Sequence, residues 1–349
     1  MKGVEPSMNR VRKIVVLVVT VPAAVAVAVS VSVSISIAVA QQNAPENPPI
    51  ALFEQWFEQV SNHGRWGPDD ELGTLNLITP EHTRKAAESV RAGVAISLSR
   101  ELKPGEDANA LAPLQVEYTG KGGGGLVSFF GDRTTMVYHG WAYSHLDALA
   151  HVASNGKLYN GYPESLAAQA DGASKLGVEN MGDGIVTRGV LIDVPWLKNV
   201  PYLEPSTAIT LEDINTWEDR TGVRIQQGDV VLIRTGRGAR EAQQGWWDVR
   251  EKGTAGPHPE IATLLHERGV ALLGGDVANE IYPSVVPGNN APMHLLAIAS
   301  MGMPLFDNLG LEAVAREARA RERWTFLFVA APLPIRHATG SAVNPLAIF

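Results

Sequence analysis

The sequence predicts an α/β fold in a single compact domain. Segments with the apolar pattern of buried strands alternate with segments that have the period of amphipathic helices, which is typical of an α/β layer architecture. After residue 53, no repeat of fixed spacing and no linker rich in Gly, Ser or Pro divides the chain. About 300 residues can bury the core of one large domain, although length alone leaves two domains open.

The elements are predicted from apolar spacing and from their end signals. A helix is expected from Thr79-Pro80, which suit the N-cap and first position, to a stop at Gly93. The remaining elements follow in chain order: strands over 189–194 and 229–234 around a helix over 211–220 that Thr210 caps, a helix over 259–268 ended by Gly269, an apolar run over 270–273 before a turn at 274–276, helices over 293–301 and 311–323, and a buried strand over 324–329. The stretch GKGGGGL at 120–126 lacks the Lys-Ser/Thr of a nucleotide loop, so we expect a mobile loop tip there and not a phosphate cradle.

The first 40 residues have the pattern of an export signal. Three basic residues between positions 10 and 13 precede an uncharged apolar run that ends in small residues at 38–40. This run of roughly 24 residues is long enough to span a bilayer, so a retained anchor is the alternative to cleavage after residue 40. We therefore expect a signal peptide over 1–40, an exposed leader over 41–53, and a domain over 54–349 in the periplasm or outside the cell.

The charge of the chain and its lack of cysteine limit the partners and the metal ligands. Residues 1–40 contain four of the 29 Lys and Arg residues and one of the 37 Asp and Glu residues, which leaves 25 basic against 36 acidic side chains. This balance argues against nucleic acid or an anionic membrane and leaves a small-molecule substrate as the expected partner. Without cysteine, only His, Asp, Glu or Gln can bind a metal, and such ligands suit Zn or Mn.

The densest group of chemically active side chains lies in HGWAYSHLDALAH at 139–151. Residues 134–143 alternate enough to form a strand, and a strand turns every second side chain to the same face. That face would carry His139, Trp141, Tyr143, His145 and Asp147. A helix from Asp147 would bring His151 beside it. Imidazole and carboxylate together can bind a divalent ion, and a further histidine can carry protons. The alternative is a set of surface or hydrogen-bonded histidines.

The segment SHLDALAH at 144–151 resembles the second half of H-x-G-T-H-x-D-x-P-x-H, the motif of the metal-dependent cyclase family, which includes bacterial kynurenine formamidases and isatin hydrolases. Three further stretches resemble that family: RWGPDDELGTLNLITPE at 65–81, GKLYNG at 156–161 and ATGSAVNPLAI at 338–348. The resemblance therefore covers about residues 54–349. It implies a compact domain with a mixed β-sheet, a barrel-like β layer and flanking helices.

The resemblance also implies roles for individual residues. His145 and Asp147 match metal ligands, and His151 matches the general acid/base. His294 and Asp307 are the nearest matches to the His and acidic residue that complete the metal site, with Asp in place of the usual Glu. The first metal-binding His of the family motif is replaced by Trp141, although His139 two residues earlier is a possible substitute. One ion, Mn or Zn, is therefore expected in preference to two.

Other residues are weaker candidates. Trp141 is expected as an aromatic wall of the substrate pocket or as a core residue. Asp276 and Glu280 are expected as pocket residues, with a solvated loop as the alternative for Glu280. Thr339 and Ser341 are expected to donate hydrogen bonds to a substrate or to form a turn. Trp246-Trp247 are expected to pack ordinarily or to line a rim or interface, and His258, His266 and His337 are given no role.

Together these features predict an exported metal-dependent hydrolase that cleaves an amide or cyclic amide C–N bond and forms a homodimer or homotetramer. The metal would activate water, and His151 would transfer protons. A lactone or ester hydrolase, a polyketide-type cyclase or dehydratase, and a secreted binding protein without catalysis remain the alternatives. A Ser-His-Asp hydrolase is not indicated because the chain has no G-x-S-x-G motif.

Overall fold

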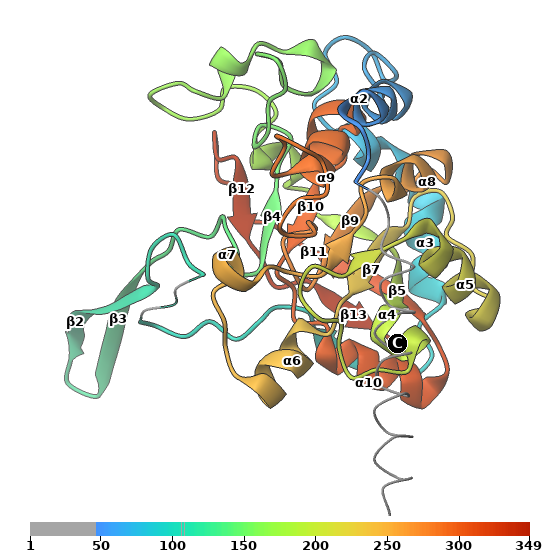
Figure 1. The fold of residues 1–349 in the computed structure, drawn as a ribbon. Coiled ribbons are helices and arrows are strands. Elements are labelled where there is room, and N and C mark those ends of the chain that lie inside the picture. The colour runs from blue at the N-terminus through green and yellow to red at the C-terminus, as the bar shows by residue number, and fades with distance from the viewer. Residues whose placement is uncertain (1–46, 106, 108) are drawn as a thin grey trace, which may run out of the picture. The chain divides into compact units, whose positions relative to one another are not determined.

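A nine-stranded mixed sheet organises the computed structural model, which describes residues 47–105, 107 and 109–349 (Figure 1). Across the sheet the strands are β1 (Ala95–Ser97), β13 (Leu346–Ile348), β11 (Thr325–Ala330), β5 (Ile185–Asp193), β7 (Val230–Arg234), β9 (Leu272–Gly275), β10 (Leu305–Asp307), β4 (His145–Asp147) and β12 (Gly340–Ala342). The four strands β5, β7, β9 and β10 are parallel, and all other pairings are antiparallel. The sheet curls into a half-barrel, so the predicted α/β class with a mixed sheet and a barrel-like layer is confirmed.

The parallel strands lie in the middle of the sheet, and helices cover them. Every residue of β7 and β9 is buried, as expected for parallel strands packed on both faces. The helices are α2 (Ile50–Gln59), α3 (Pro80–Glu88), α4 (Val194–Lys198), α5 (Leu211–Thr221), α6 (Arg237–Gln244), α7 (Val249–Lys252), α8 (Ile261–Glu267), α9 (Pro292–His294) and α10 (Glu312–Arg321). Short 3₁₀ turns lie at 73–77, 159–161, 164–166 and 178–181, and the small strands β6 (Ala208–Ile209) and β8 (Gly256–Pro257) pair with each other.

Most predicted elements are present, with shifted ends. Helix α5 begins at the predicted cap Thr210, whose hydroxyl accepts a hydrogen bond from the backbone N–H of Asp213. Helix α3 begins after Thr79 as predicted but ends at Glu88, so Gly93 does not end it. The predicted turn at 274–276 is wrong for its two glycines, which belong to β9. The predicted helix over 293–301 consists of α9 followed by a π-helical segment, Leu295–Met301, and ends at Gly302 with φ 67°.

Two predictions around the histidine-rich segment are wrong. Strand β3 (Val127–Thr135) ends before most of the predicted strand over 134–143, because residues 136–144 form a loop in which Gly140 has φ 110°. The predicted loop tip at 120–126 lies mainly in strand β2 (Gln115–Gly124), which pairs with β3 in a separate two-stranded sheet. In Figure 1 this β2–β3 hairpin projects from the rest of the described domain.

The predicted signal peptide over residues 1–40 lies outside the described residues. Helix α2 begins at Ile50 and buries Phe53, so the last four residues of the predicted leader belong to a packed helix. Among the described residues, no helix is both long enough and apolar enough to cross a membrane.

Candidate metal centre

Strand β4 is the base of a buried cluster of histidines and carboxylates. His145 and Asp147 are two residues apart on this strand and therefore point to one face, while Leu146 points to the other. In the antiparallel pairing with β10, Asp307 lies directly opposite His145. Residues paired in this way share a face of the sheet. The register alone thus places three potential ligands together, and all three are buried.

Three further histidines reach this face from outside the sheet. His294 ends α9, and His139 lies in the loop before β4. His151 follows β4 in a turn closed by a hydrogen bond from its N–H to the carbonyl of Ala148 (2.9 Å). The helix predicted from Asp147 is therefore absent. The turn nevertheless brings His151 beside Asp147, as the predicted helix would have done.

Asp147 is the common neighbour of the four imidazoles. Its Oδ1 lies 2.8 Å from His139 Nδ1, 3.4 Å from His145 Nε2 and 3.8 Å from His151 Nε2. Its Oδ2 lies 3.5 Å from His294 Nε2. A second carboxylate closes the cluster, since Asp307 Oδ2 lies 3.4 Å from His294 Nε2 and 4.0 Å from His145 Nε2.

The donor set fits a divalent cation. Both carboxylate oxygens of Asp147 are buried, and neither accepts a well-directed hydrogen bond, although His139 Nδ1 is close to one of them. Buried charges in proteins are paired with other charges or coordinate metals, and an unsatisfied buried carboxylate is a common sign of a bound ion or water. Ligand atoms lie within 4.8 Å of one another in two overlapping groups, His139–Asp147–His151 and His145–Asp147–Asp307. Metal bonds of about 2.0–2.2 Å in tetrahedral geometry separate ligands by roughly 3.3–3.6 Å. In the second group the His145–Asp147 distance of 3.4 Å lies in this range, and the His145–Asp307 distance of 4.0 Å is longer.

Burial and the charges within the cluster shift the pKa values of its members. Burial would raise the pKa of Asp147, but the charges of His151 and His145 outweigh it and hold that pKa well below its usual range. Burial would lower the pKa of His145, yet the attraction of Asp147 raises it to about 9. At His151 burial prevails and lowers the pKa to about 4. A cation at Asp147 would therefore compete with the proton held on His145.

Neighbouring groups fix the orientation of the ligands. The carbonyl of Tyr143 lies 2.8 Å from His145 Nδ1, so the Nε2 of that ring is left to face the carboxylates. Glu280 Oε1 lies 2.9 Å from His294 Nδ1 and accepts a hydrogen bond from the His294 backbone N–H (2.9 Å). Asn279 Nδ2 donates to Asp307 Oδ1 (2.6 Å). Such partners set the tautomer and direction of metal-binding side chains.

A cavity of about 330 Å³ opens onto the cluster, and its lining includes His145, Asp147, His151, His294 and Asp307. Trp141 and Tyr282 line it as well, with ring centroids 5.4 Å apart. The structure thus places Trp141 beside the metal-binding face and not in the main hydrophobic core. A volume of this size suits a small molecule.

Two of the predicted substrate contacts, Asp276 and Ser341, lie outside this cavity, although Asp276 lines a separate cavity of about 700 Å³ together with Arg100 and Glu241. Asp276 is not in this cavity; its carboxylate accepts hydrogen bonds from the N–H groups of Thr235, Gly236 and Arg237 and from the Thr235 hydroxyl. Ser341 is fully buried, and its hydroxyl donates to the carbonyl of Ala342 and accepts from the N–H of Leu333.

Thr339 lies near the cluster, where its hydroxyl is 3.1 Å from His139 Nε2. His258, His266 and His337 are not among the residues that line the cavity.

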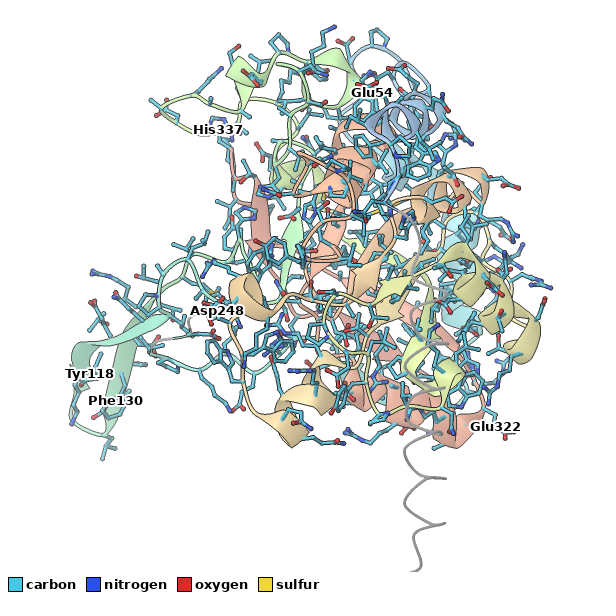
Figure 2. All side chains as sticks on the ribbon, viewed as in Figure 1. Glu54, Tyr118, Phe130, Asp248, Glu322 and His337 are labelled. Atoms are coloured by element: carbon cyan, nitrogen blue, oxygen red, sulfur yellow. The ribbon has the colours of Figure 1, made fainter. Side chains whose placement is uncertain are left out.

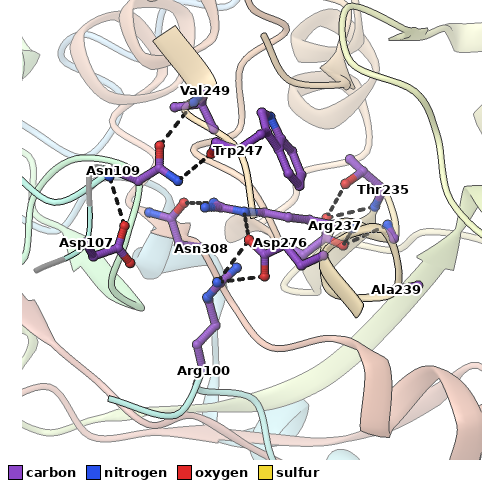
Figure 3. A network of polar contacts seen from close by, with 12 residues as sticks. Arg100, Asp107, Asn109, Thr235, Arg237, Ala239, Trp247, Val249, Asp276 and Asn308 are labelled. Atoms are coloured by element: carbon purple, nitrogen blue, oxygen red, sulfur yellow. Dashed lines mark hydrogen bonds and ion pairs between the residues drawn. The ribbon is translucent and has the colours of Figure 1, made fainter. Parts of the chain in front are cut away.

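A polar network that includes Arg237, Asn308 and Asp276 lies beside the end of β10 (Figure 3). The Asn308 side chain donates to the carbonyl of Gly140 (2.8 Å) and accepts from the buried guanidinium of Arg237 (2.9 Å). The Ser144 hydroxyl donates to the Asn308 carbonyl (2.7 Å). Because Asn308 follows Asp307 of the cluster, it links the end of β10 to the loop that carries His139.

Sequence reasoning gave no role to several residues around the ligands or in the cavity lining, among them Asn279, Tyr282, Asn290 and Asn308, and named Glu280 only as a weak candidate. It also missed Arg237, which contacts Asn308. The stretch GGDVANEIYP after a predicted strand end was the available signal for the first two. No pattern in the sequence indicates the contact between Arg237 and Asn308, because 71 positions separate them.

Comparison with known proteins gives a consistent result. The model of a family described as "Putative cyclase" matches residues 71–279. A solved structure described as a novel cyclase is 27% identical, with a TM-score of 0.73 over 84% of this chain and 99% of that one. Isatin hydrolase A from Labrenzia aggregata, bound to benzyl benzoate, is 22% identical, with a TM-score of 0.52 over 75% and 94%.

Isatin hydrolase A from Ralstonia solanacearum is 21% identical to the chain, with a TM-score of 0.54 over 75% of this chain and 93% of that one. At this level of identity the two isatin hydrolases show a shared fold. No curated protein matches the chain.

Proposed function

The chain belongs to this cyclase family, and on that premise we propose that it is a metal-dependent hydrolase of a small-molecule amide or cyclic amide. One observation carries the proposal: the buried Asp147 has two oxygens without well-directed hydrogen bonds, surrounded by four imidazoles and a second carboxylate. Two structures with the same fold are named after isatin, whose ring contains an amide, which is why we place C–N bonds before esters.

We assign the metal to the inner ligands His145, Asp147 and Asp307, with His294 beside them. When bound, a divalent Mn or Zn ion supplies Lewis acidity that polarises a carbonyl and lowers the pKa of water. One ion is proposed, because the rings of His139 and His151 are stacked 4.0 Å apart and nearly parallel, at 7°. Imidazole lone pairs lie in the ring plane, so an ion that bound both of these stacked rings would lie out of the plane of at least one of them.

His151 is the proposed general acid/base. Its ring lines the cavity, and its Nε2 faces Asp147 at 3.8 Å. From this position Nε2 can take a proton from the water that attacks the carbonyl carbon. As the C–N bond breaks, the same atom can deliver the proton to the leaving nitrogen. The stacked His139 ring limits rotation of His151, and Trp141 and Tyr282 offer a face for a planar substrate.

The proposal is tested by assaying the metal-loaded protein on N-formylkynurenine, on isatin and on a panel of amides and lactones. His151→Ala should retain one metal ion per chain and lose 10²–10⁴-fold in kcat/KM, the usual contribution of general acid–base catalysis. The matched control is His63→Ala, because His63 is exposed and outside the cavity. Full metal without turnover of any substrate by the wild type would favour a binding protein, and faster turnover of lactones would favour ester chemistry.

We also propose export to the periplasm or the cell exterior, and only the pattern of residues 1–40 supports this. Mass spectrometry of the protein from cell fractions would test it. A mature N-terminus at Gln41 in the exported fraction is expected, and an intact N-terminus in the membrane fraction would indicate a retained anchor.

A further inference from the structure

Thr339 contacts the histidine cluster from outside the cavity lining. It lies just before β12, two residues after His337, which is labelled in Figure 2. Its carbonyl accepts a hydrogen bond from the N–H of Ala148 (2.9 Å), and the carbonyl of Ala148 accepts one from the N–H of His151 (2.9 Å). The backbone of Thr339 is therefore bound to the turn that carries the proposed general acid/base, and a change of its side chain leaves these backbone bonds in place.

The Thr339 hydroxyl faces one nitrogen of His139, and the Asp147 carboxylate faces the other. Thr339 Oγ1 lies 3.1 Å from His139 Nε2, and Asp147 Oδ1 lies 2.8 Å from His139 Nδ1. A neutral imidazole carries a proton on one nitrogen and a lone pair on the other, and an ionised carboxylate has no proton to donate. A proton on Nδ1 attracts the carboxylate oxygen, whereas a lone pair there would repel it. Nδ1 therefore holds the proton, and Nε2 accepts a hydrogen bond from the Thr339 hydroxyl.

The contact with Asp147 needs this support from Thr339. It is close, but it is not a well-directed hydrogen bond. Among the described residues, His139 is the only hydrogen-bond partner of the Thr339 hydroxyl, so the donor is not shared with another acceptor. Donation to Nε2 stabilises the tautomer of His139 that has its proton on Nδ1. Loss of the hydroxyl would leave Nε2 free to take that proton.

This tautomer leaves neutral His139 without a free lone pair for a cation. By distance alone, His139 belongs to a possible metal-binding group with Asp147 and His151. The 2.8 Å between His139 Nδ1 and Asp147 Oδ1 is, however, shorter than the roughly 3.3–3.6 Å between two ligands of a tetrahedral ion. It is a usual hydrogen-bonding distance. The ring therefore contacts the ligand Asp147 without serving as a ligand itself.

Ring packing holds His139 against His151. The two rings have centroids 4.0 Å apart and planes 7° apart, and the ring of Tyr138 contacts His139 at 4.7 Å. A Cβ added at Gly340 would lie 3.0 Å from His139 Cε1, so the backbone there packs closely against the ring edge. Stacking limits the tilt of a ring but allows it to turn in its own plane. Contacts at the two nitrogens restrict that second motion, and Thr339 supplies one of them.

We propose that Thr339 is a positioning residue for the hydrolysis proposed above: by donating to His139 Nε2, it keeps His139 out of the metal site and holds it as a fixed support for His151. The effect on turnover rests on that proposed function, because His151 acts as a base only in a hydrolase. The tautomer of His139 and the number of metal ions do not depend on it. Groups that contact metal ligands commonly set ring tautomer and direction in this way.

Nitrogen-15 NMR of protein with labelled histidines tests the tautomer directly. In the zinc-loaded wild type we expect the His139 proton on Nδ1 and no zinc at either nitrogen of this ring, with one ion per chain by elemental analysis. The His139 signals are assigned by their loss in His139→Gln. Thr339→Val keeps the shape of the side chain and removes the hydroxyl, so a measurable share of the ring should carry its proton on Nε2. Thr339→Ser should restore the wild-type signals.

Kinetics and chemical modification test the positioning of His151. A small misplacement of a catalytic group lowers kcat strongly, so Thr339→Val should lower kcat about tenfold with KM within about twofold, and Thr339→Ser should recover to within about threefold. In the metal-free protein, His151 of Thr339→Val should react several-fold faster with diethyl pyrocarbonate, measured by mass spectrometry of peptides. The control is Thr263→Val, which removes a half-buried hydroxyl on α8 that bonds the carbonyl of Glu260; it should match the wild type in every measurement.

Three results would overturn the proposal: zinc bound to His139, a wild-type ring with its proton on Nε2, or a Thr339→Val variant that keeps the wild-type tautomer and modification rate. A wild type that turns over no substrate would instead refute the function proposed above, and the tautomer, metal count and modification rate would still decide the role of Thr339. Thermal denaturation of each variant confirms that the chain folds.

Discussion

Asp147→Asn should abolish the stabilisation of this protein by metal. The change keeps the size and shape of the side chain while removing the charge shared by both ligand groups. A ligand that binds only the folded state at 1,000 times its Kd stabilises it by about 4.1 kcal/mol. The unfolding entropy of about 300 ordered residues is roughly 0.6 kcal/mol/K. The expected rise in Tm of the wild type on adding metal is therefore about 6–7 °C, and that of the variant is below about 1 °C.

The assay compares melting curves of chelator-treated protein before and after addition of Mn or Zn, together with elemental analysis of metal per chain. Asp183→Asn is the matched control, because it makes the same chemical change at an exposed carboxylate. If Asp147→Asn kept the full metal-dependent shift and one ion per chain, the metal would bind elsewhere and the assignment of this cluster would fail.

Three further variants test groups around the ligands. Glu280→Gln removes the charge beside His294 Nδ1 and should weaken metal affinity about 10–100-fold in a chelator competition, whereas unchanged affinity would show that Glu280 does not orient the ligand. Asn308→Ala leaves the buried Arg237 guanidinium short of an acceptor and should lower the free energy of unfolding by about 2–3 kcal/mol in urea titrations; a loss below 0.5 kcal/mol would contradict this. Trp141→Ala should raise KM for an aromatic substrate about tenfold with metal content unchanged, while Trp141→Phe should raise it less; equal KM values would exclude Trp141 as a pocket wall.

The sequence predicts long elements well because they contain several repeats of a pattern. Strand β7 is a run of buried residues, and α5 begins at a threonine that caps it and ends before a glycine in the left-handed conformation. The strands that build the metal-binding face have only three residues each. Three residues hold no period that distinguishes a strand from a turn. The family motif therefore located His145 and Asp147, but periodicity could not locate β4.

One physical cause explains why Asp276 and Ser341, both predicted as substrate contacts, bind backbone groups outside the cavity at the histidine cluster. An acidic residue after a strand end, or a hydroxyl beside a glycine, suits both ligand binding and the capping of nearby backbone groups. Asp276 satisfies three N–H groups at the start of α6, and Ser341 satisfies one N–H and one carbonyl. Which use prevails depends on neighbours distant in the sequence. Residue type and local pattern alone cannot decide it.

The position of His139 shows why motif spacing failed at one point and succeeded at another. His145 and Asp147 lie on a strand, where an offset of two residues fixes a shared face. Residues 136–144 form a loop, so the offset there sets no direction. His139 consequently reaches Asp147 at 2.8 Å although its spacing departs from the motif, while Trp141, at the motif position, contacts Tyr282 in the lining of the cavity. Trp141 in place of a histidine therefore does not leave the site short of imidazole. His139 contacts the Asp147 carboxylate, and Trp141 lines the pocket.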